Sequence, residues 1–198
     1  MRTIAWFSAG AASAVAAKLA IEEHGASVQV VLCDTLDAEH PDNRRFVDDV
    51  SRWLGRDVVI IRSAEYASID DVFTRTRYMA GIAGARCTVE MKKKPREAYQ
   101  QPGDLHVFGF TSDEAERAAR FDKNNPSVQA QHILVERGVS KADCLRMVEA
   151  ANIKLPAMYG LGFEHNNCIG CVKSTSAGYW NRVRRLFPDV FKRRAAQS

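Results

Sequence analysis

The chain has 198 residues, of which 46% are hydrophobic and 26% are charged, and these proportions fit one globular domain with a full core. The formal net charge of +4 fits an anionic substrate such as a nucleotide and permits nucleic acid, although a basic solvated surface explains it equally well. No apolar run is long enough to span a bilayer, and five cysteines, an odd number that includes a C-x-x-C pair, argue against a disulfide framework.

The first twenty residues superficially resemble a secretory signal peptide, because one early arginine precedes an alanine-rich apolar stretch. Ser8 and Gly10 interrupt that stretch, and Lys18 stands where the cleavage region would be. A strand, a turn and a helix describe the segment better. We therefore expect a cytoplasmic protein with reduced cysteines.

Apolar runs alternate with helical segments along the first part of the chain. We predict strands at residues 3–7, 28–33, 58–61 and 105–110, of which the second and third are apolar enough to be buried on both faces. An alanine-rich helix closes at Gly25, and an amphipathic helix runs from Pro41 to Gly55. This alternation predicts an α/β fold with a doubly wound, mostly parallel sheet and helices on both faces. Ligands bind beyond the carboxyl ends of such strands, which are followed here by the loops at residues 8–13, 34–42 and 109–117.

The C-terminal part has a different pattern. A helix with a serine cap is predicted at residues 140–151, a Gly- and Asn-rich loop at 152–171, and a basic helix at 179–192 that Pro188 interrupts or ends. We therefore predict one domain over residues 1–198, with a nucleotide-binding core at 1–138 and a cysteine-bearing, metal-binding extension at 139–198.

The turn after the first strand has the composition of an anion site. Small residues there leave backbone N–H groups free, and the dipole of the following helix favours negative charge. The candidate phosphate-binding residues are Ser8, Gly10, Ala11 and Ser13. A tight glycine turn made for packing alone has the same spacing.

Residues 8–13 resemble the S-G-G-x-D-S loop of the pyrophosphate-loop ATPases and sulfonucleotide reductases, in the phosphoadenosine-phosphosulfate reductase-like family. The resemblance implies an adenine nucleotide alpha-hydrolase fold and ATP or a related adenine nucleotide as ligand. Ser8, Gly10 and Ser13 match the loop, whereas Ala11 and Ala12 replace its usual lysine and aspartate. The lost lysine argues against ATP hydrolysis more than against nucleotide binding.

Two further segments follow in the order of this family. Asp34, Thr35 and Glu39 resemble its D-T-G-x-E-x-P segment, and a strand-end aspartate can accept from an adenine amine or a ribose hydroxyl. A helix cap or turn former is the alternative for Asp34. Gly109 and Glu114 match its G-x-R-x-x-E-S-x-x-R segment, in which Thr111 replaces the first arginine.

Arg117 also matches that segment, at its last position. It could supply the phosphate charge that the loop lacks, because arginine pairs with phosphate in a bidentate manner. An ion pair with Glu114 on a solvated helix face is the alternative.

Residues 86–95 resemble the C-T-x-x-L-K-x-x-P element of the reductase-like group, with Met91 in the leucine position. The resemblance makes Cys87 and Lys92 candidate catalytic residues beside Arg117, with Lys92 facing a phosphate or sulfate. A solvated run of three lysines is the alternative, and it describes Lys93 or Lys94 better.

The C-x-x-C pair, Cys168 and Cys171, can chelate one metal or two corners of a cluster, because the turn at Gly170 brings both sulfurs to one side. Cys87 is the expected third ligand, and His165 could complete a zinc site. The family resemblance favours a [4Fe–4S] cluster over zinc. We expect the two remaining cysteines, Cys33 and Cys144, to be buried apolar residues.

Three functions remain open at this point. The first is ATP-dependent sulfur transfer to an adenylated substrate, with tRNA, DNA or a small molecule as acceptor. The second is sulfonucleotide reduction, against which the absence of a cysteine after Cys171 argues, because such reductases use a mobile cysteine in a C-terminal tail. The third is a non-catalytic module that binds nucleotide or nucleic acid and contains structural zinc.

Overall fold

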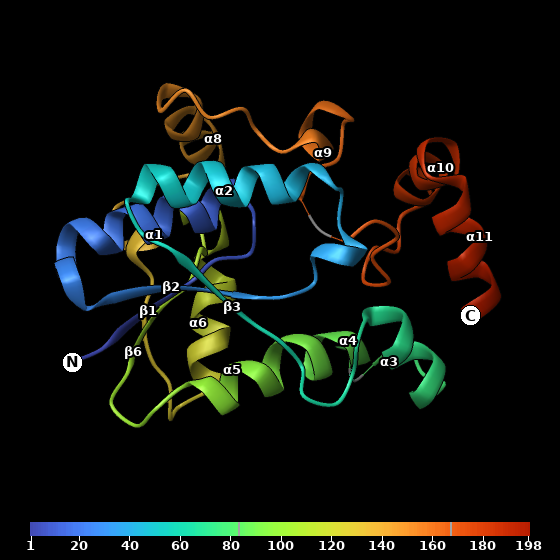
Figure 1. The fold of residues 1–198 in the computed structure, drawn as a ribbon, viewed down its shortest axis with the longest axis horizontal. Helices are drawn as coiled ribbons and strands as arrows, with labels where there is room; N and C mark the ends of the chain where they lie inside the picture. The colour runs from blue at the N-terminus through green and yellow to red at the C-terminus, as the bar shows by residue number, and fades with distance from the viewer. Residues whose placement is uncertain (83, 167) are drawn as a thin grey trace.

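The computed structural model describes residues 1–82, 84–166 and 168–198. Within them the main sheet has the strand order β3-β2-β1-β6-β7, and every adjacent pair is parallel (Figure 1). The strands are β1 (Thr3–Trp6), β2 (Val28–Cys33), β3 (Val58–Ile61), β6 (Leu105–Val107) and β7 (Gln129–Gln131). The predicted α/β class with a mostly parallel sheet is confirmed.

The central strand β1 pairs with β2 on one side and with β6 on the other, so that Thr3 lies opposite both Val28 and Leu105. Its apolar residues are buried because helices cover both faces of the sheet, and Ile4 has no exposed surface. This central position brings the turn after β1 to the middle of the carboxyl edge of the sheet.

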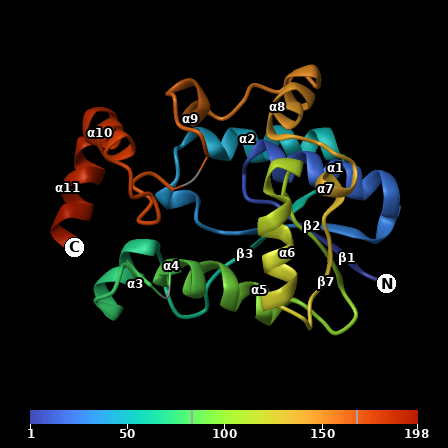
Figure 2. The same ribbon diagram turned by 180° about the vertical axis from the view of Figure 1, so that it is seen from behind.

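Helices cover the sheet on two sides (Figures 1 and 2). One side carries α1 (Ala11–His24), α2 (Asp42–Leu54), α7 (Ile133–Glu136) and α8 (Lys141–Ala150), and the other carries α5 (Lys94–Tyr99) and α6 (Ala115–Asn124). Helix α1 is buried along most of its length, and its alanines let α8 pack closely against it. The predicted serine cap is confirmed, because the Ser140 hydroxyl accepts from the backbone N–H of Asp143 at 3.2 Å.

Two strand predictions need correction. The run at 58–61 forms the edge strand β3, with Val59 38% and Ile60 41% exposed, whereas its apolar composition predicts burial on both faces. The run at 105–110 stops being a strand after Val107, where the chain turns across the carboxyl edge of the sheet. Apolar composition shows that a segment pairs with neighbours, but it does not say how many neighbours there are.

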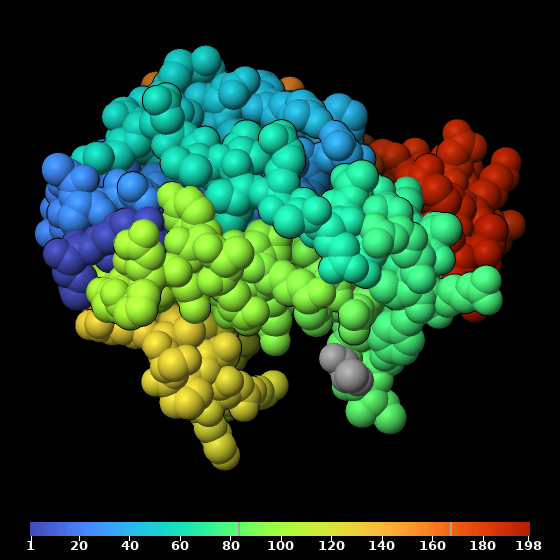
Figure 3. Space-filling view, turned by 60° about the horizontal axis from the view of Figure 1, so that its bottom comes forward, coloured from blue at the N-terminus to red at the C-terminus, as the bar shows by residue number. Residues whose placement is uncertain are grey.

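The segment between β3 and β6 was not predicted in detail from the sequence. It contains α3 (Ile69–Thr76), the antiparallel pair β4 (Ala80–Gly81) and β5 (Gly84–Ala85), α4 (Arg86–Thr88), a π-helical turn η3 (Val89–Lys93) and α5. Figure 3 shows this hairpin region and the region around α6 projecting on either side of a hollow. The π-helical turn is the local feature that carries Lys92.

The C-terminal helices form a smaller apolar cluster of their own. Helices α9 (Ala157–Gly160), α10 (Ala177–Leu186) and α11 (Pro188–Gln197) surround the buried side chains of Met158, Phe163, Ile169 and Val183. The predicted basic helix is interrupted, as expected, near Pro188: α10 ends at Leu186, Phe187 lies between the two helices, and Pro188 is the first residue of α11. Both lie at the end of the molecule opposite the N-terminus (Figure 1). None of the helices in the described part of the chain has the length and apolar character needed to cross a membrane.

Candidate functional site

A cavity of about 600 Å³ opens at the carboxyl edge of the sheet, where β1, β2 and β6 end. All three loops chosen from the sequence contribute to its wall, as expected for an open parallel sheet. The predicted site residues that line it are Ser8, Gly10, Ala11, Ser13, Thr35, Lys92, Gly109, Glu114 and Arg117. Asp34, Cys87, Cys168 and Cys171 are not among the lining residues.

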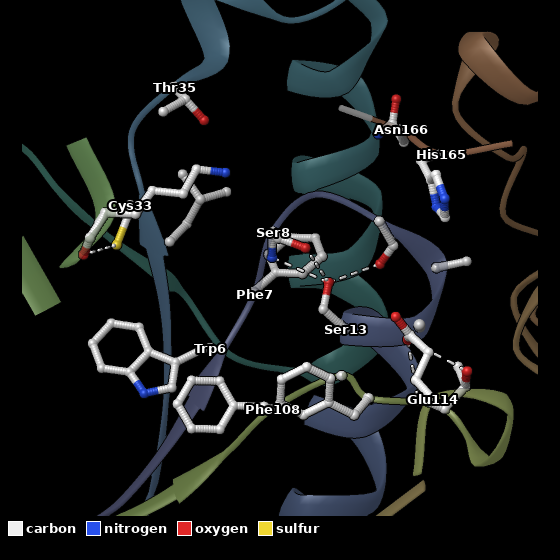
Figure 4. A pocket seen from close by; sticks show the side chains of 18 of the residues that line it. Trp6, Phe7, Ser8, Ser13, Cys33, Thr35, Phe108, Glu114, His165 and Asn166 are labelled. Atoms are coloured by element: carbon white, nitrogen blue, oxygen red, sulfur yellow. Dashed lines mark hydrogen bonds between the residues drawn. The ribbon is translucent and has the colours of Figure 1, made fainter. Parts of the chain in front are cut away.

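The candidate phosphate-binding turn at residues 8–13, called the phosphate loop below, is closed by hydrogen bonds within itself (Figure 4). The Ser13 hydroxyl accepts from the backbone N–H of Ser8 at 3.1 Å, donates to the carbonyl of Gly10 at 2.9 Å and lies 3.1 Å from the Ser8 hydroxyl. Ala9 adopts a left-handed φ of +54°, at a position where the resembling loop has glycine. These internal hydrogen bonds fix the shape of the loop at the N-terminus of α1, the position at which a helix dipole favours an anion.

Gly109 is needed for a close approach between two chain segments. A Cβ atom at this position would lie 2.8 Å from both the backbone nitrogen and the Cα of Ser13. Any larger residue would therefore push the loop after β6 away from the first turn of α1. The glycine of the predicted nucleotide segment thus has a packing reason that the sequence did not reveal.

The segment after β2 divides into two parts. Asp34 accepts from the backbone N–H of Leu36 at 3.2 Å and pairs with Arg62 at 2.9 Å, which are the contacts of a turn former. Thr35 lies in the cavity wall and donates to Glu39 at 2.7 Å, and the amide of Asn43 donates to the other oxygen of that carboxylate at 2.7 Å. A nucleotide-binding role for Asp34 stays a prediction, whereas Thr35 and Glu39 border the cavity.

Glu114 and Arg117 form the ion pair of the alternative interpretation, at 2.5 Å. The Glu114 carboxylate also accepts from the backbone N–H of Thr111 at 3.3 Å, which caps the turn before α6. The Arg117 guanidinium lies over the Phe110 ring at 5.2 Å and is 67% exposed. The guanidinium therefore already has a carboxylate partner, in an exposed pair of the kind that contributes little energy.

Lys92 borders both the cavity and the cysteines. Burial disfavours its charged form, but the neighbouring Cys168 and Glu39 outweigh that effect and raise the pKa of the Lys92 ammonium. The lysine therefore stays protonated and adds a positive charge to the cavity wall. Its neighbour Lys93 is exposed at the cavity rim, and Lys94 pairs with the buried Glu90 at 2.6 Å.

The three predicted metal ligands gather beyond Lys92. Cys87, on α4, and Cys168 both pack against the apolar cluster that contains Met91. Burial raises the pKa of the Cys168 thiol to about 12. The charge of Lys92 opposes this increase, whereas Cys171 and Cys87 add to it. Burial likewise raises the pKa of Cys87, with Cys171 adding to the effect. No three His, Cys, Asp or Glu side chains within residues 1–82, 84–166 and 168–198 are arranged to hold a single ion.

The C-x-x-C turn is held by contacts from distant parts of the chain. The backbone N–H of Ile169 donates to the carbonyl of Ala38 at 2.9 Å, and that of Cys171 donates to the Tyr179 hydroxyl at 2.7 Å. Gly170 has a φ of +68°, and a Cβ atom there would lie 2.9 Å from Val190. Helices α10 and α11 therefore determine where the two cysteines lie.

The other candidate ligand and the remaining cysteines lie elsewhere. His165 lines the cavity at the phosphate-loop end, 3.4 Å from the Lys141 ammonium, so the structure does not bring this candidate zinc ligand to the cysteines. Cys144 is buried, as predicted, and burial raises its pKa to about 12. Cys33 is only partly buried, because it ends β2 and lines the cavity, where its thiol lies 3.6 Å from the carbonyl of Lys92.

Some cavity residues escaped the sequence analysis. Trp6, Arg96, Lys141 and Asn166 all line the cavity, although no motif marks them. The lysine run at residues 92–94 already indicated a basic wall on this side, and Arg96 extends that wall along α5. For Lys141, at the start of α8, the sequence contains no comparable signal.

No protein-family model matches the chain, and no curated protein matches it in sequence. Among solved structures, phosphoadenylyl-sulfate reductase from Candida auris, in a phosphate complex, superposes with a TM-score of 0.60 and 13% identity over 89% of this chain and 84% of that one. The U34-tRNA thiolase NcsA from Methanococcus maripaludis, with its [4Fe-4S] cluster, gives a TM-score of 0.48 and 12% identity over 100% of this chain and 72% of that one. At such low identity the first likeness establishes the fold alone. The chain therefore has the fold of phosphoadenylyl-sulfate reductase, which confirms at the level of the fold the resemblance drawn from the motifs.

Proposed function

We propose that this protein is an adenine-nucleotide-binding enzyme that transfers sulfur to a substrate activated by adenylation, with an iron–sulfur cluster bound by Cys87, Cys168 and Cys171. One observation carries the proposal. Lys92 borders the candidate nucleotide cavity on one side and three partly buried cysteines on the other. Such proximity suits a reaction that joins nucleotide chemistry to sulfur chemistry.

The cavity fits a nucleotide in size and charge. Its volume of about 600 Å³ lies within the range typical of small-molecule sites. Backbone N–H groups of the phosphate loop, the Ser8 hydroxyl and the ammonium group of Lys92 are the groups that would bind phosphate oxygens. ATP is the nucleotide that the proposed reaction requires.

The proposed chemistry has two steps. A substrate oxygen attacks the α-phosphorus of ATP, a new P–O bond forms, and pyrophosphate leaves. The sulfur of a hydrosulfide or a carried equivalent then attacks the activated carbon, the C–O bond breaks, and AMP leaves with the oxygen. Lys92 would stabilise the negative charge that develops on the phosphoryl oxygens, because its ammonium stays protonated in the cavity wall.

The motif resemblance favours a cluster over zinc, because three thiolates by themselves suit either metal. A cluster would bind each thiolate to a different iron. When bound by three thiolates, a [4Fe–4S] cluster supplies one iron with an open position for a sulfur atom.

The test is the iron and acid-labile sulfide content of protein purified without oxygen, together with its absorption spectrum. We expect near-stoichiometric iron and sulfide, lost in Cys87→Ala, Cys168→Ala and Cys171→Ala. Cys144→Ala is the matched control, because Cys144 packs in the main core away from the cluster. One zinc and no iron in the wild-type protein would exclude the cluster and favour a binding module with structural zinc.

Turnover distinguishes the two catalytic alternatives. Sulfite released from phosphoadenosine phosphosulfate would identify a sulfonucleotide reductase. Pyrophosphate released from ATP only in the presence of an acceptor would support sulfur transfer. Candidate acceptors for this assay are tRNA, DNA and small molecules.

A further inference from the structure

A second polar cluster lies next to the phosphate loop, and no motif marks it. The Asn166 amide donates to the carbonyl of Ala9 at 2.5 Å, which attaches residues 164–166 to the loop. The Lys141 ammonium donates to the carbonyl of Glu164 and lies 3.4 Å from Nδ1 of His165. Figure 4 shows His165 and Asn166 together beside the loop that carries Ser8 and Ser13.

This cluster contains an unsatisfied acceptor. Asn166 is 6% exposed, and its Oδ1 has no hydrogen-bond partner among the described residues. A buried amide oxygen without a donor is costly, so this position requires a donor such as a buried water molecule. Asn166 borders the cavity, but its Oδ1 has almost no accessible surface and is not the atom that meets a ligand.

The cluster also contains a lysine ammonium that donates to a backbone carbonyl and not to a carboxylate. Within the described part of the chain Lys141 forms no ion pair, whereas Arg117 on the same side of the cavity is paired with Glu114. Partial burial and the charge of Lys141 lower the pKa of His165. Among the described residues, Lys141 is thus a cation at this end of the cavity without an ion-pair partner, although the Asp113 carboxylate accepts from its backbone N–H at 2.9 Å.

The phosphate loop lacks its own cation. Ala11 stands where the resembling loops have lysine, and Thr111 stands where the resembling segment has arginine. Both positions line the same cavity as Lys141 and His165. The two positions that have lost a basic residue and the Lys141 ammonium therefore border the same cavity.

We propose that Lys141, with His165 beside it, forms a polyphosphate subsite that replaces the missing loop lysine. The ligand class is a nucleoside triphosphate, whose β- and γ-phosphates would lie between the loop and the Lys141 ammonium. The Asn166 amide holds residues 164–166 against the loop, which keeps His165 beside the subsite. This inference rests on the proposed nucleotide-binding function and adds the residues that select the number of phosphates.

The test compares ATP with AMP binding by isothermal titration calorimetry on the full chain. Lys141→Met is expected to weaken ATP binding about tenfold and to leave AMP binding unchanged, because only the outer phosphates contact the ammonium. Lys141→Arg should retain most of the ATP affinity. His165→Asn is a second variant, with a smaller loss for ATP alone. Lys123→Met, at an exposed position outside the cavity, is the matched control.

Two results would overturn the inference and leave the proposed function intact. One is wild-type ATP affinity in Lys141→Met. The other is an equal loss of ATP and AMP binding, because it would mean that Lys141 only holds residues 164–166 in place. If the wild-type protein binds neither nucleotide, the proposed function fails together with this subsite.

Discussion

The phosphate loop and the C-x-x-C turn serve the same proposed reaction, but they are held in place by different kinds of contact. The loop closes on itself through Ser8 and Ser13, only five positions apart. The turn at Gly170 makes its contacts with Ala38, Tyr179 and Arg194, which lie in other elements. Local hydrogen bonds form with little loss of chain entropy, whereas the distant contacts require the whole tertiary structure.

This difference predicts which substitutions should disturb each region of the site. A change in α10 or α11 should affect the cysteines more than the loop, because the loop closes through its own hydrogen bonds and is joined to the C-terminal part at Asn166. The expected result is that metal content and nucleotide affinity respond to different substitutions. Substitutions in each region test this independence.

Two glycines provide the strongest test, one in each region. Gly170→Ala places a methyl group 2.9 Å from Val190 at a φ of +68°, which strains the turn by about 1–2 kcal/mol before the overlap is counted. We expect loss of most of the bound iron, measured together with acid-labile sulfide, and unchanged ATP affinity. Gly109→Ala pushes against Ser13, and we expect about tenfold weaker ATP binding with full iron content.

The expected pattern is loss of iron in Gly170→Ala alone and loss of ATP affinity in Gly109→Ala alone. Circular dichroism and thermal unfolding of both variants serve as the control for folding. If either glycine variant lowers both iron content and ATP affinity while remaining folded, the phosphate loop and the C-x-x-C turn are not held in place independently.

The C-terminal anchor should give an intermediate effect. Arg194 is 4% exposed, donates to the carbonyl of Gly170 at 3.3 Å and pairs with Asp70. Arg194→Met leaves that carboxylate without its buried partner, and we expect about 2 kcal/mol lower free energy of unfolding, together with reduced iron content. Urea unfolding and metal analysis measure the two effects.

The adjacent arginine offers a matched control. Arg193 pairs with the same Asp70 at 3.1 Å but is 48% exposed, so its ion pair contributes little. Arg193→Met should therefore retain its iron and nearly all of its stability. Equal losses in both variants would show that the charge on Asp70, and not the contact with Gly170, is what matters.

The last prediction concerns stability alone, at a distant support of the phosphate-loop region. Asp42 pairs with Arg45 and accepts from the backbone N–H of Ala157 at 2.9 Å, which joins α2 to α9, where Tyr159 lines the cavity. The hydrogen bonds with Arg45 lower the pKa of Asp42 to about 2 from its ordinary 3.8. The ionised carboxylate therefore stabilises the fold above pH 4, and this contribution is lost as the pH falls towards 2.

Asp42→Asn should lower the free energy of unfolding by about 2 kcal/mol at pH 7. The difference between variant and wild type should shrink as the pH falls from about 4 to about 2, as followed by urea unfolding at each pH. Asp37→Asn, at a carboxylate that is 76% exposed, is the control and should show neither effect. A difference that persists unchanged at pH 2 would mean that packing, and not ionisation, accounts for the role of Asp42.

Much of the fold could be predicted because the signals are local. The apolar runs that became β1 and β2 are buried on both faces, and burial of that kind requires continuous apolar sequence. The strand β7, with the sequence Gln-Ala-Gln, was missed because it has no apolar pattern, and it is a strand only through its pairing with β6. The edge position of β3 was missed because composition does not reveal how many neighbours a strand has.

The sequence by itself determined the α/β class, the phosphate loop and the cysteine motif, because each depends on residues that are close together in the chain. The tertiary structure decided which distant residues meet, since that depends on how the helices pack and where the strands end. It brought Cys87 to the C-x-x-C turn, took His165 away from the cysteines, and placed Lys141 beside a phosphate loop that lacks its lysine. A short motif indicates which chemistry a segment suits. A replacement for a lost basic residue, as proposed here for Lys141, can be recognised only once the packed chain shows which distant residues lie beside the motif.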